Sequence, residues 1–320
     1  YGEADSVDPE GSVTVIEVKA KAKKLSATTV DFHAYDGLED DLRAAGVRLF
    51  GPGARASQDL EPEYIAVTED GKKAFVTLQE NNAVAVLDLK KLEFVDILPL
   101  GFKDHSLAGN GLDGSDRDGA GNSGGIQIAP WPVYGMYLPD AIATYRVRGK
   151  DYFVTANEGD SRQDWFEEEA RLKDLDLDLT VFPDADDLQD DDFIGRLTVT
   201  TTLGDADGDG LYEAVYAFGG RSFSIWAADG TLAFDSGDAF EQITAEAYPT
   251  NFNSDHAANP FDTRSDNKGP EPEGIVLGRI GSCTYAFIGL ERIGGIMVYD
   301  ISEPTAPEFV QYINHRDFSG

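Results

Sequence analysis

The stretch that decides the fold is PEYIAVTEDGKKAFVTLQENNAVAVLDLKKLEFVDILPL, residues 62–100. Strand-like apolar runs alternate here with turn signals: TEDGKK follows the first run, QENN the second and LKKLE the third. Four antiparallel strands within about 40 residues are typical of one blade of a β-propeller.

The same pattern returns three times further along the chain. Residues 272–313 align with it over their whole length, residues 138–160 form a third copy, and residues 212–237 form a weaker fourth. Repetition at this scale predicts an all-β protein, a β-propeller with long loop inserts. A β-sandwich is the alternative, but the repeated Pro-Glu or Pro-Asp at the start of three of the copies argues against it.

Three long inserts interrupt the copies, at about residues 101–137, 161–195 and 246–270. The only helix-like stretch lies in the second insert, from Trp165 to Leu175. Residues 1–320 are interpreted as a single propeller domain. Because propellers usually close by pairing strands from both ends, this domain is expected to be a fragment of a longer chain.

The chain is strongly acidic, with 59 acidic and 26 basic residues and a formal net charge of −33. Such a surface repels nucleic acid and anionic membranes and attracts cations. No apolar run reaches the length of a transmembrane segment. A single cysteine, Cys283, excludes an intramolecular disulfide.

An acidic turn, GDADGDGLYEAVY, occupies residues 204–216. Calcium prefers six to eight oxygen ligands, among them carboxylates and a backbone carbonyl. The spacing supplies the carboxylates of Asp205, Asp207, Asp209 and Glu213 and the carbonyl of Leu211. The turn resembles the calcium hairpins of integrin-type propellers, although their ninth residue is usually Asp rather than Glu. It predicts a structural Ca²⁺ site, and a hydrated acidic turn is the alternative.

A second acidic loop, GLDGSDRDG, offers Asp113, Asp116 and Asp118 as a weaker candidate metal site. Its spacing is less regular, and Arg117 could neutralise it from within. The acidic run at residues 184–192 has no ligand order and is interpreted as a solvated face.

The innermost strand of a propeller blade lines the central channel. Glu63, Asp140 and Glu273 stand at the start of that strand in three copies, and we expect them to converge. The other candidate ligand-binding residues are Asn157, Glu158, Asp160, Arg162, Arg221, Lys268, Glu271, Glu291 and Arg292. Carboxylates there could hold a divalent metal, and the basic groups could meet phosphate or carboxylate. The alternative is structural, with acids binding backbone amides of neighbouring blades.

Four motifs, GLDGSDRDG, ANEGDSR, FGGRSFSIW and SDNKGPEPEG, occur in this order. Together they resemble the choice-of-anchor I domain family over about residues 1–318. That family includes mesenchyme-specific cell-surface glycoproteins associated with biomineralisation and members labelled alkaline phosphatase. The resemblance implies a secreted or surface-held, seven-bladed propeller, with the export signal outside this chain.

Two functions remain open from the sequence. The favoured one is a calcium-binding extracellular or cell-surface propeller that acts in binding, adhesion or mineral association. Its candidate partners are divalent cations, phosphate, mineral or a surface polymer. The alternative is a metal-dependent phosphoesterase, alkaline phosphatase-like or phytase-like, that uses the channel carboxylates with Arg and Lys. The common motifs of serine hydrolases, zinc proteases and P-loops are absent, so no catalytic residue is assigned.

Overall fold

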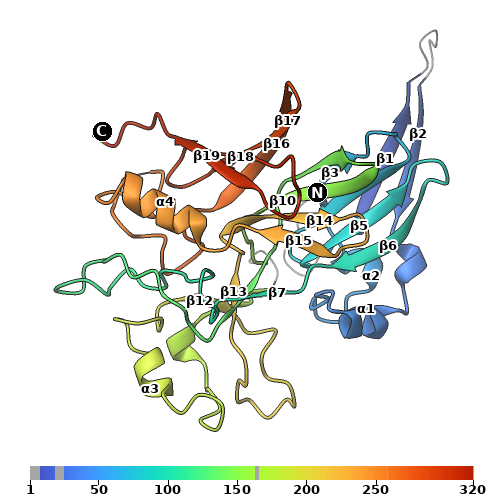
Figure 1. The fold of residues 1–320 in the computed structure, drawn as a ribbon. Helices are drawn as coiled ribbons and strands as arrows, with labels where there is room; N and C mark the ends of the chain where they lie inside the picture. Colours follow the sequence, from blue (N-terminus) through green and yellow to red (C-terminus); the bar gives the residue numbers. More distant parts are fainter. Residues whose placement is uncertain (1–7, 19–24, 163–165, 258, 320) are drawn as a thin grey trace.

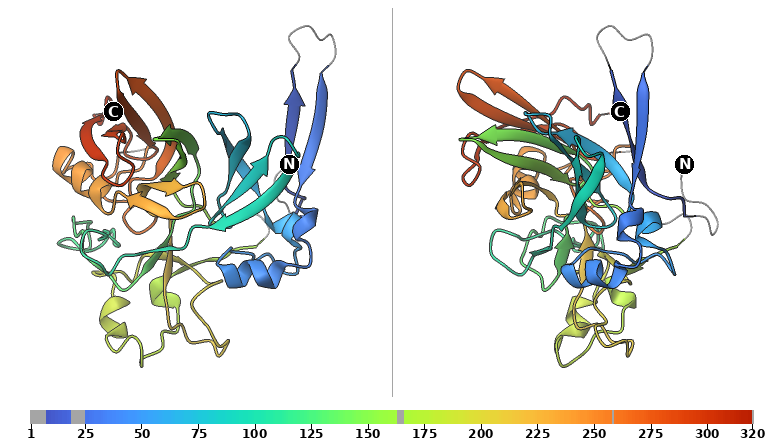
Figure 2. Two further views of the ribbon diagram at one scale, coloured as in Figure 1. Left: turned by 45° about the vertical axis from the view of Figure 1, so that its right-hand side comes forward. Right: turned by 90° about the vertical axis from the view of Figure 1, so that its right-hand side faces the viewer.

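The structure is a computed structural model that describes residues 8–18, 25–162, 166–257 and 259–319 (Figure 1). Its strands form five sheets, and three of these have four strands each. The four-stranded sheets stand one after another, with a two-stranded hairpin beside the first (Figure 2). This arrangement is propeller-like and confirms the predicted all-β class. Within the described residues no strand of the first sheet pairs with the last sheet.

The first four-stranded sheet is the stretch on which the fold prediction depends. Its strands are β3 (Pro62–Val67), β4 (Lys73–Leu78), β5 (Ala83–Asp88) and β6 (Glu93–Pro99), paired in chain order. Nearly every residue of β4 and β5 is buried, whereas β3 is mostly exposed. Both faces of the central strands are covered by neighbouring layers, which explains their continuous apolar runs.

The second predicted full blade is confirmed as well. It contains β16 (Pro272–Ile280), β17 (Cys283–Leu290), β18 (Ile296–Asp300) and β19 (Glu308–Ile313), again paired in chain order. Both sheets therefore consist of three consecutive hairpins whose turns the sequence marks.

The third and fourth copies prove to be two halves of one sheet, so their interpretation as separate copies is wrong. The hairpin of β9 (Ile142–Val147) and β10 (Lys150–Asn157) pairs with the hairpin of β14 (Ser222–Ala227) and β15 (Leu232–Asp235). β10 and β14 join the halves in register, from Tyr152 opposite Ala227 to Asn157 opposite Ser222. Each half alone has only one hairpin, and pairing satisfies the open edge of both.

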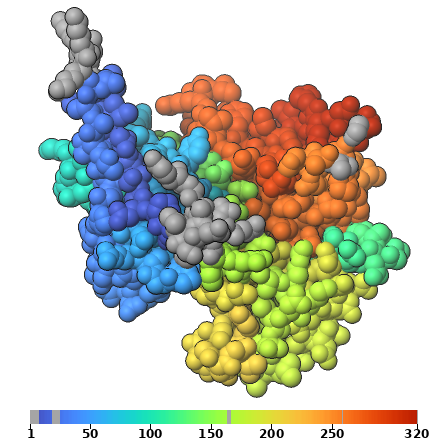
Figure 3. All heavy atoms as spheres, turned by 180° about the vertical axis from the view of Figure 1, so that it is seen from behind, coloured from blue at the N-terminus to red at the C-terminus, as the bar shows by residue number. Residues whose placement is uncertain are grey.

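The first two inserts, together with residues 198–218, build a layer of their own rather than loops alone. A five-stranded sheet forms from β7 (Phe102–Asp104), β8 (Tyr134–Met136), β11 (Glu169–Arg171), β12 (Thr198–Thr200) and β13 (Tyr216–Phe218). It encloses a separate apolar core, which includes Leu112, Ile194 and Val199. In Figure 3 this part of the chain forms a lobe that projects from the blades.

The helix expected at Trp165–Leu175 is not formed in the described part of that segment. Residues 166–175 contain the strand β11 and the 3-10 turn η2 (Leu172–Asp174), and Trp165 lies outside the described residues. Glu168 is fully buried against Arg48 and Thr200. The α-helices lie elsewhere: α1 (Glu39–Ala45), α2 (Ala56–Asp59), α3 (Ala185–Leu188) and α4 (Ala239–Ala247).

Apolar side chains pack between successive sheets, as in a propeller. Phe75 of the first sheet meets Phe153 of the second, with ring centroids 4.8 Å apart. Phe223 of the second sheet meets Tyr299 of the third at 4.7 Å. These contacts set β3 beside β9 and β9 beside β16, so the three innermost strands are neighbours.

Candidate functional site

The acidic hairpin at residues 204–214 connects β12 to β13 in the insert layer. Its base is closed by the carbonyl of Gly204, which accepts hydrogen bonds from the amides of Glu213 (2.8 Å) and Ala214 (3.3 Å). Gly204 has φ +111°, and a Cβ on it would lie 2.1 Å from the Ala214 carbonyl oxygen. Only glycine fits this close approach, which brings the two ends of the acidic loop together.

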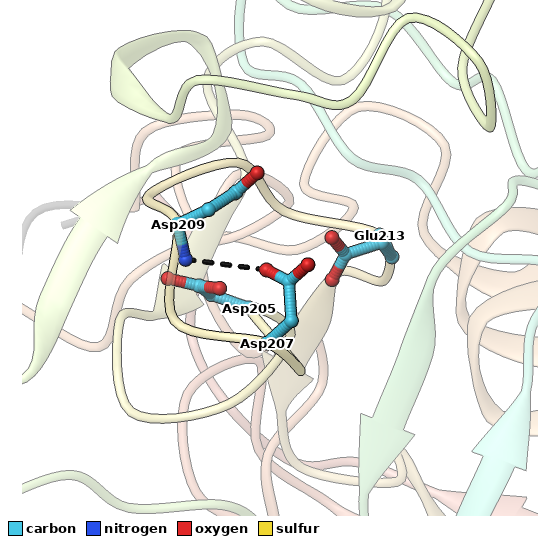
Figure 4. A group of neighbouring side chains, drawn as sticks. All are labelled: Asp205, Asp207, Asp209 and Glu213. Atoms are coloured by element: carbon cyan, nitrogen blue, oxygen red, sulfur yellow. Dashed lines mark hydrogen bonds between the residues drawn. The ribbon is translucent and has the colours of Figure 1, made fainter.

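Backbone amides of the loop hold its carboxylates in place. Asp205 accepts hydrogen bonds from the amides of Gly208 (2.7 Å) and Gly210 (3.0 Å), and Glu213 accepts one from the amide of Ala206 (2.9 Å). Asp209 donates its amide to Asp207 at 3.2 Å, as Figure 4 shows. The side chains are therefore fixed by the turn itself.

The four carboxylates of Asp205, Asp207, Asp209 and Glu213 are brought together as the sequence predicts. Each offers an oxygen, and these oxygens lie within 4.8 Å of one another. The amide of Leu211 donates to Asp209 at 2.8 Å, while a ligand role for its carbonyl stays a prediction. Like charges held this close repel unless a cation or hydrating water lies among them. The geometry suits a hard divalent cation.

The repeated acids of the innermost strands also lie near one another, at the starts of β3, β9 and β16, and this region is called the mouth below. Asp140 is half-buried; burial and the carboxylate of Glu273 raise its pKa to about 6. Glu63 is exposed at the surface, but the protein around it displaces part of the water near its carboxylate. This desolvation, together with the carboxylates of Glu80 and Asp140, raises the pKa of Glu63 to about 8. Glu63 and Asp140 thus interact although they belong to different sheets, and so do Asp140 and Glu273.

Lys268 lies at the centre of the same mouth. Its Nζ is 3.4 Å from Glu158, 3.7 Å from Asp160 and 3.8 Å from Glu271. Burial, partly offset by the Lys268 charge, raises the pKa of Glu158 to about 7. Oxygens of Glu158, Glu271 and Glu291 lie within 4.8 Å of one another, but here the protein supplies its own cation.

Two arginines extend this network. Arg292 Nε is 3.0 Å from both Glu271 and Glu291, and Arg264 Nε is 2.6 Å from Glu271. The fully buried Glu271 is thus paired on both oxygens. Arg264 was not among the candidates predicted from sequence, although it stands directly before the motif SDNKGPEPEG.

Two other predicted ligand-binding residues, Asn157 and Arg162, are used inside the protein. Asn157 donates from its amide to Ser222 (3.1 Å) and Ser224 (2.7 Å) within the second sheet. Arg162 is buried and pairs with Asp59, with its guanidinium over the ring of Phe50. None of these contacts brings Asn157 or Arg162 to the carboxylate cluster around Lys268.

Arg221 is buried too, and its guanidinium makes four hydrogen bonds. It donates to the carbonyls of Asp113 (2.6 Å), Ser265 (2.8 Å) and Asn267 (2.8 Å) and to Glu241 Oε1 (2.6 Å). It therefore ties two inserts and α4 together. Because its guanidinium is engaged by these protein groups, the structure does not support the predicted contact between Arg221 and phosphate.

The weaker site of Asp113, Asp116 and Asp118 is divided by the fold. Asp116 pairs with Arg196 and, at 3.5 Å, with Arg117. Asp113 is buried and accepts the amide of Gln127 at 2.7 Å. Asp118 points elsewhere in the same loop, so the three do not form one compact ligand set among the described residues.

The chain is therefore a propeller-like protein of the all-β class. It has a candidate cation site in the acidic hairpin and a second group of carboxylates around Lys268. Residues 2–304 match the model of the choice-of-anchor I domain, and the chain belongs to that family. No helix in the described ranges is long and apolar enough to cross a bilayer.

Two curated relatives are similar to parts of the chain. Gigasin-3a of Magallana gigas is 36% identical over 122 residues, which are 36% of this chain and 42% of that protein. The mesenchyme-specific cell surface glycoprotein of Strongylocentrotus purpuratus is 28% identical over 328 residues, which are 85% of this chain and 40% of that protein. The chain thus spans about two fifths of each relative's length.

Among solved structures, a functionally unknown protein from Desulfotomaculum acetoxidans DSM 771 superposes with a TM-score of 0.30 at 12% identity. The superposition covers 94% of this chain and 63% of the other. A likeness this weak adds nothing to the fold described above.

Proposed function

We propose that this chain is a calcium-binding protein of the extracellular space or cell surface that acts in binding, adhesion or mineral association. The observation that carries the proposal is the hairpin of Asp205, Asp207, Asp209 and Glu213, with four carboxylates gathered within 4.8 Å. Oxygen ligands of this kind, from one short loop with backbone support, suit Ca²⁺.

The hairpin is a better cation site than the mouth around Lys268. Within the described residues no ion pair joins the hairpin carboxylates to a basic side chain, so their charge is left to solvent ions. At the mouth, Lys268, Arg264 and Arg292 already occupy the carboxylates. A metal there would have to displace protein cations, which lowers its affinity.

A surface location is supported by the family and by charge. One relative is named a cell surface glycoprotein, and the net charge of −33 suits a protein that meets cations or a mineral face. Calcium held by the hairpin would order the turn between β12 and β13, at the exposed side of the insert lobe. The hairpin would then present fixed charge to a mineral or polymer.

Calorimetric titration with Ca²⁺ tests the proposal on the wild type, Asp207→Asn and Asp229→Asn. Asp207→Asn removes a charge but keeps an acceptor oxygen for the turn. Asp229→Asn is the matched control, because Asp229 also caps an exposed turn, by accepting the amide of Thr231 at 3.1 Å. We expect weaker binding for Asp207→Asn alone. Equal binding by all three proteins would refute the assignment.

A metal-dependent phosphoesterase remains the second candidate, on the observation that Glu158, Glu271 and Glu291 gather beside Lys268. With Arg221 engaged elsewhere, Lys268 and Arg292 are the predicted basic groups that lie beside these carboxylates and could hold phosphate. A phosphomonoester panel with added Ca²⁺, Mg²⁺, Mn²⁺ or Zn²⁺ tests it. Activity that Lys268→Met abolishes would support this function, and no turnover by the wild type would end it.

A further inference from the structure

A cavity of about 490 Å³ opens in the insert lobe beside the acidic hairpin. Four segments of the chain line it, within residues 104–106, 132–134, 181–188 and 213–214. Its volume lies in the range of small-ligand sites, about 300–1,000 Å³. The cavity is separate from the mouth around Lys268 and shares only Glu213 with the hairpin.

The walls of this cavity are apolar, and its charged groups are all acidic. The apolar side chains are those of Val133, Val181, Phe182, Pro183 and Leu188. Asp104, Asp184 and Glu213 add three carboxylates, and no Lys, Arg or His of the described chain lines the cavity. These three do not form a compact group that would hold a metal ion among the described residues. The cavity therefore suits an elongated organic cation, with an apolar stem for the walls and a charged end for the carboxylates.

The three carboxylates are held by local hydrogen bonds or left to solvent. Asp104 Oδ1 accepts the amide (2.9 Å) and the hydroxyl (2.6 Å) of Ser106. Glu213, which lies beside Asp207 in Figure 4, accepts the amide of Ala206 through Oε2 alone. Asp184 directly precedes α3 but makes no capping hydrogen bond with its side chain. Because none of the three pairs with a basic side chain within the described ranges, their charge is available to a ligand.

A row of aromatic rings leads away from the cavity. Tyr134, whose ring lines the cavity, is 38% exposed and lies opposite Asp104 in the β7–β8 pairing and opposite Tyr216 in the β8–β13 pairing. The ring centroids of Tyr134 and Tyr216 are 5.5 Å apart, and those of Tyr216 and Phe102 are 4.7 Å apart. Phe102 is 37% exposed and, with Tyr216, lines a second cavity of about 560 Å³. The aromatic row of Tyr134, Tyr216 and Phe102 thus runs from one cavity to the other.

We propose that this face of the five-stranded sheet binds an extended, proline-rich segment of a partner polypeptide that carries an arginine. Proline-rich segments dock in aromatic-lined grooves, because their extended conformation is already formed before binding. The aromatic row supplies such a surface, and the acidic cavity at its end supplies the complementary charge. The inference rests on the binding role proposed above and names a partner for it, but it does not require Ca²⁺ in the hairpin.

The arginine enters the cavity beside Tyr134. Its aliphatic stem packs against the apolar walls, and its guanidinium reaches the carboxylates of Asp104 and Asp184. Arginine is favoured over lysine, because a planar guanidinium binds carboxylates through two parallel hydrogen bonds and also stacks on an aromatic ring.

Fluorescence anisotropy tests the proposal with a labelled oligoproline peptide that has one central arginine. A second peptide has norleucine in place of the arginine, and EDTA keeps the hairpin free of Ca²⁺. The proteins are the wild type, Asp184→Asn, Tyr134→Ala and the control Asp186→Asn. Asp186 is an exposed residue of α3 that does not line the cavity, so this control corrects for the loss of one negative charge from a strongly acidic protein.

The two peptides separate the cavity from the aromatic row. Asp184→Asn should bind the arginine peptide about threefold to tenfold more weakly than the wild type, while Asp186→Asn should bind it as the wild type does. The norleucine peptide should bind more weakly than the arginine peptide and should not distinguish Asp184→Asn from the wild type. Tyr134→Ala should weaken the binding of both peptides, because it removes a ring of the aromatic row.

Two results would overturn the proposal: no binding of the arginine peptide to the wild type up to millimolar concentration, or equal effects of Asp184→Asn and Asp186→Asn. Asp184 is exposed and caps no helix, so this comparison does not depend on whether Tyr134→Ala folds. A neutral β-linked oligosaccharide is titrated in parallel. If it binds through Tyr134 and the peptide does not, the aromatic row is a saccharide site and the inference is refuted. The calcium titration of the hairpin is unaffected by any of these outcomes.

Discussion

Replacement of Arg221 by methionine distinguishes a structural arginine from a ligand-binding one. Its guanidinium makes four hydrogen bonds that join two inserts and α4. Methionine keeps much of the apolar volume but donates no hydrogen bond. The substitution leaves Glu241, which is also fully buried, without its basic partner.

The expected loss of stability follows from this burial. Removal of one partner from a buried ion pair costs about 3–5 kcal/mol, because the remaining charge stays out of water. Arg146 provides the matched control: it pairs with Asp151 at 3.1 Å near the surface. Arg146→Met should cost less than about 1 kcal/mol, as exposed ion pairs usually do.

Urea unfolding of Arg221→Met, Arg146→Met and the wild type measures both losses. A large loss for Arg221→Met alone supports the structural role. A loss below about 1 kcal/mol for Arg221→Met would refute the reasoning. If phosphate stabilised the wild type and Arg221→Met abolished that effect, Arg221 would instead be a ligand residue.

Three further outcomes are expected. Gly204→Ala should weaken Ca²⁺ binding in a calorimetric titration, because the new methyl collides with the carbonyl of Ala214, and unchanged affinity would contradict this. In metal-free protein the raised pKa of Glu63 means that the folded state holds a proton that the unfolded chain releases. Its contribution to stability should fall as pH rises from 4.5 to about 8, and Glu63→Gln should flatten that slope in urea titrations. Phe75→Ala should cost about 3–5 kcal/mol by urea unfolding, because it empties the packed contact with Phe153, and a loss under about 1 kcal/mol would refute that packing.

Local patterns predicted the parts of the fold that local contacts form. Residues 62–100 and 272–313 each fold into hairpins between consecutive strands, so the turns that the sequence marks also set the pairing. The acidic hairpin was predictable for the same reason. Its ligands and the amides that hold them all lie between Gly204 and Ala214.

Long-range pairings could not be predicted in this way. The partner of β10 lies beyond an insert, and the small sheet joins three-residue strands, with β8 and β13 running parallel. The helix prediction failed because residues 169–171 pair as a strand with β12, which lies beyond most of the insert.

The split second sheet has a consequence for biosynthesis. β10 leaves the ribosome roughly 65 residues before β14, its partner. At a translation rate of about 5–20 residues per second, the nascent hairpin waits roughly 3–13 seconds with an open edge. Chaperone dependence and misassembly should therefore concentrate on this sheet, and the neighbouring blades, whose strands emerge in pairing order, should escape them.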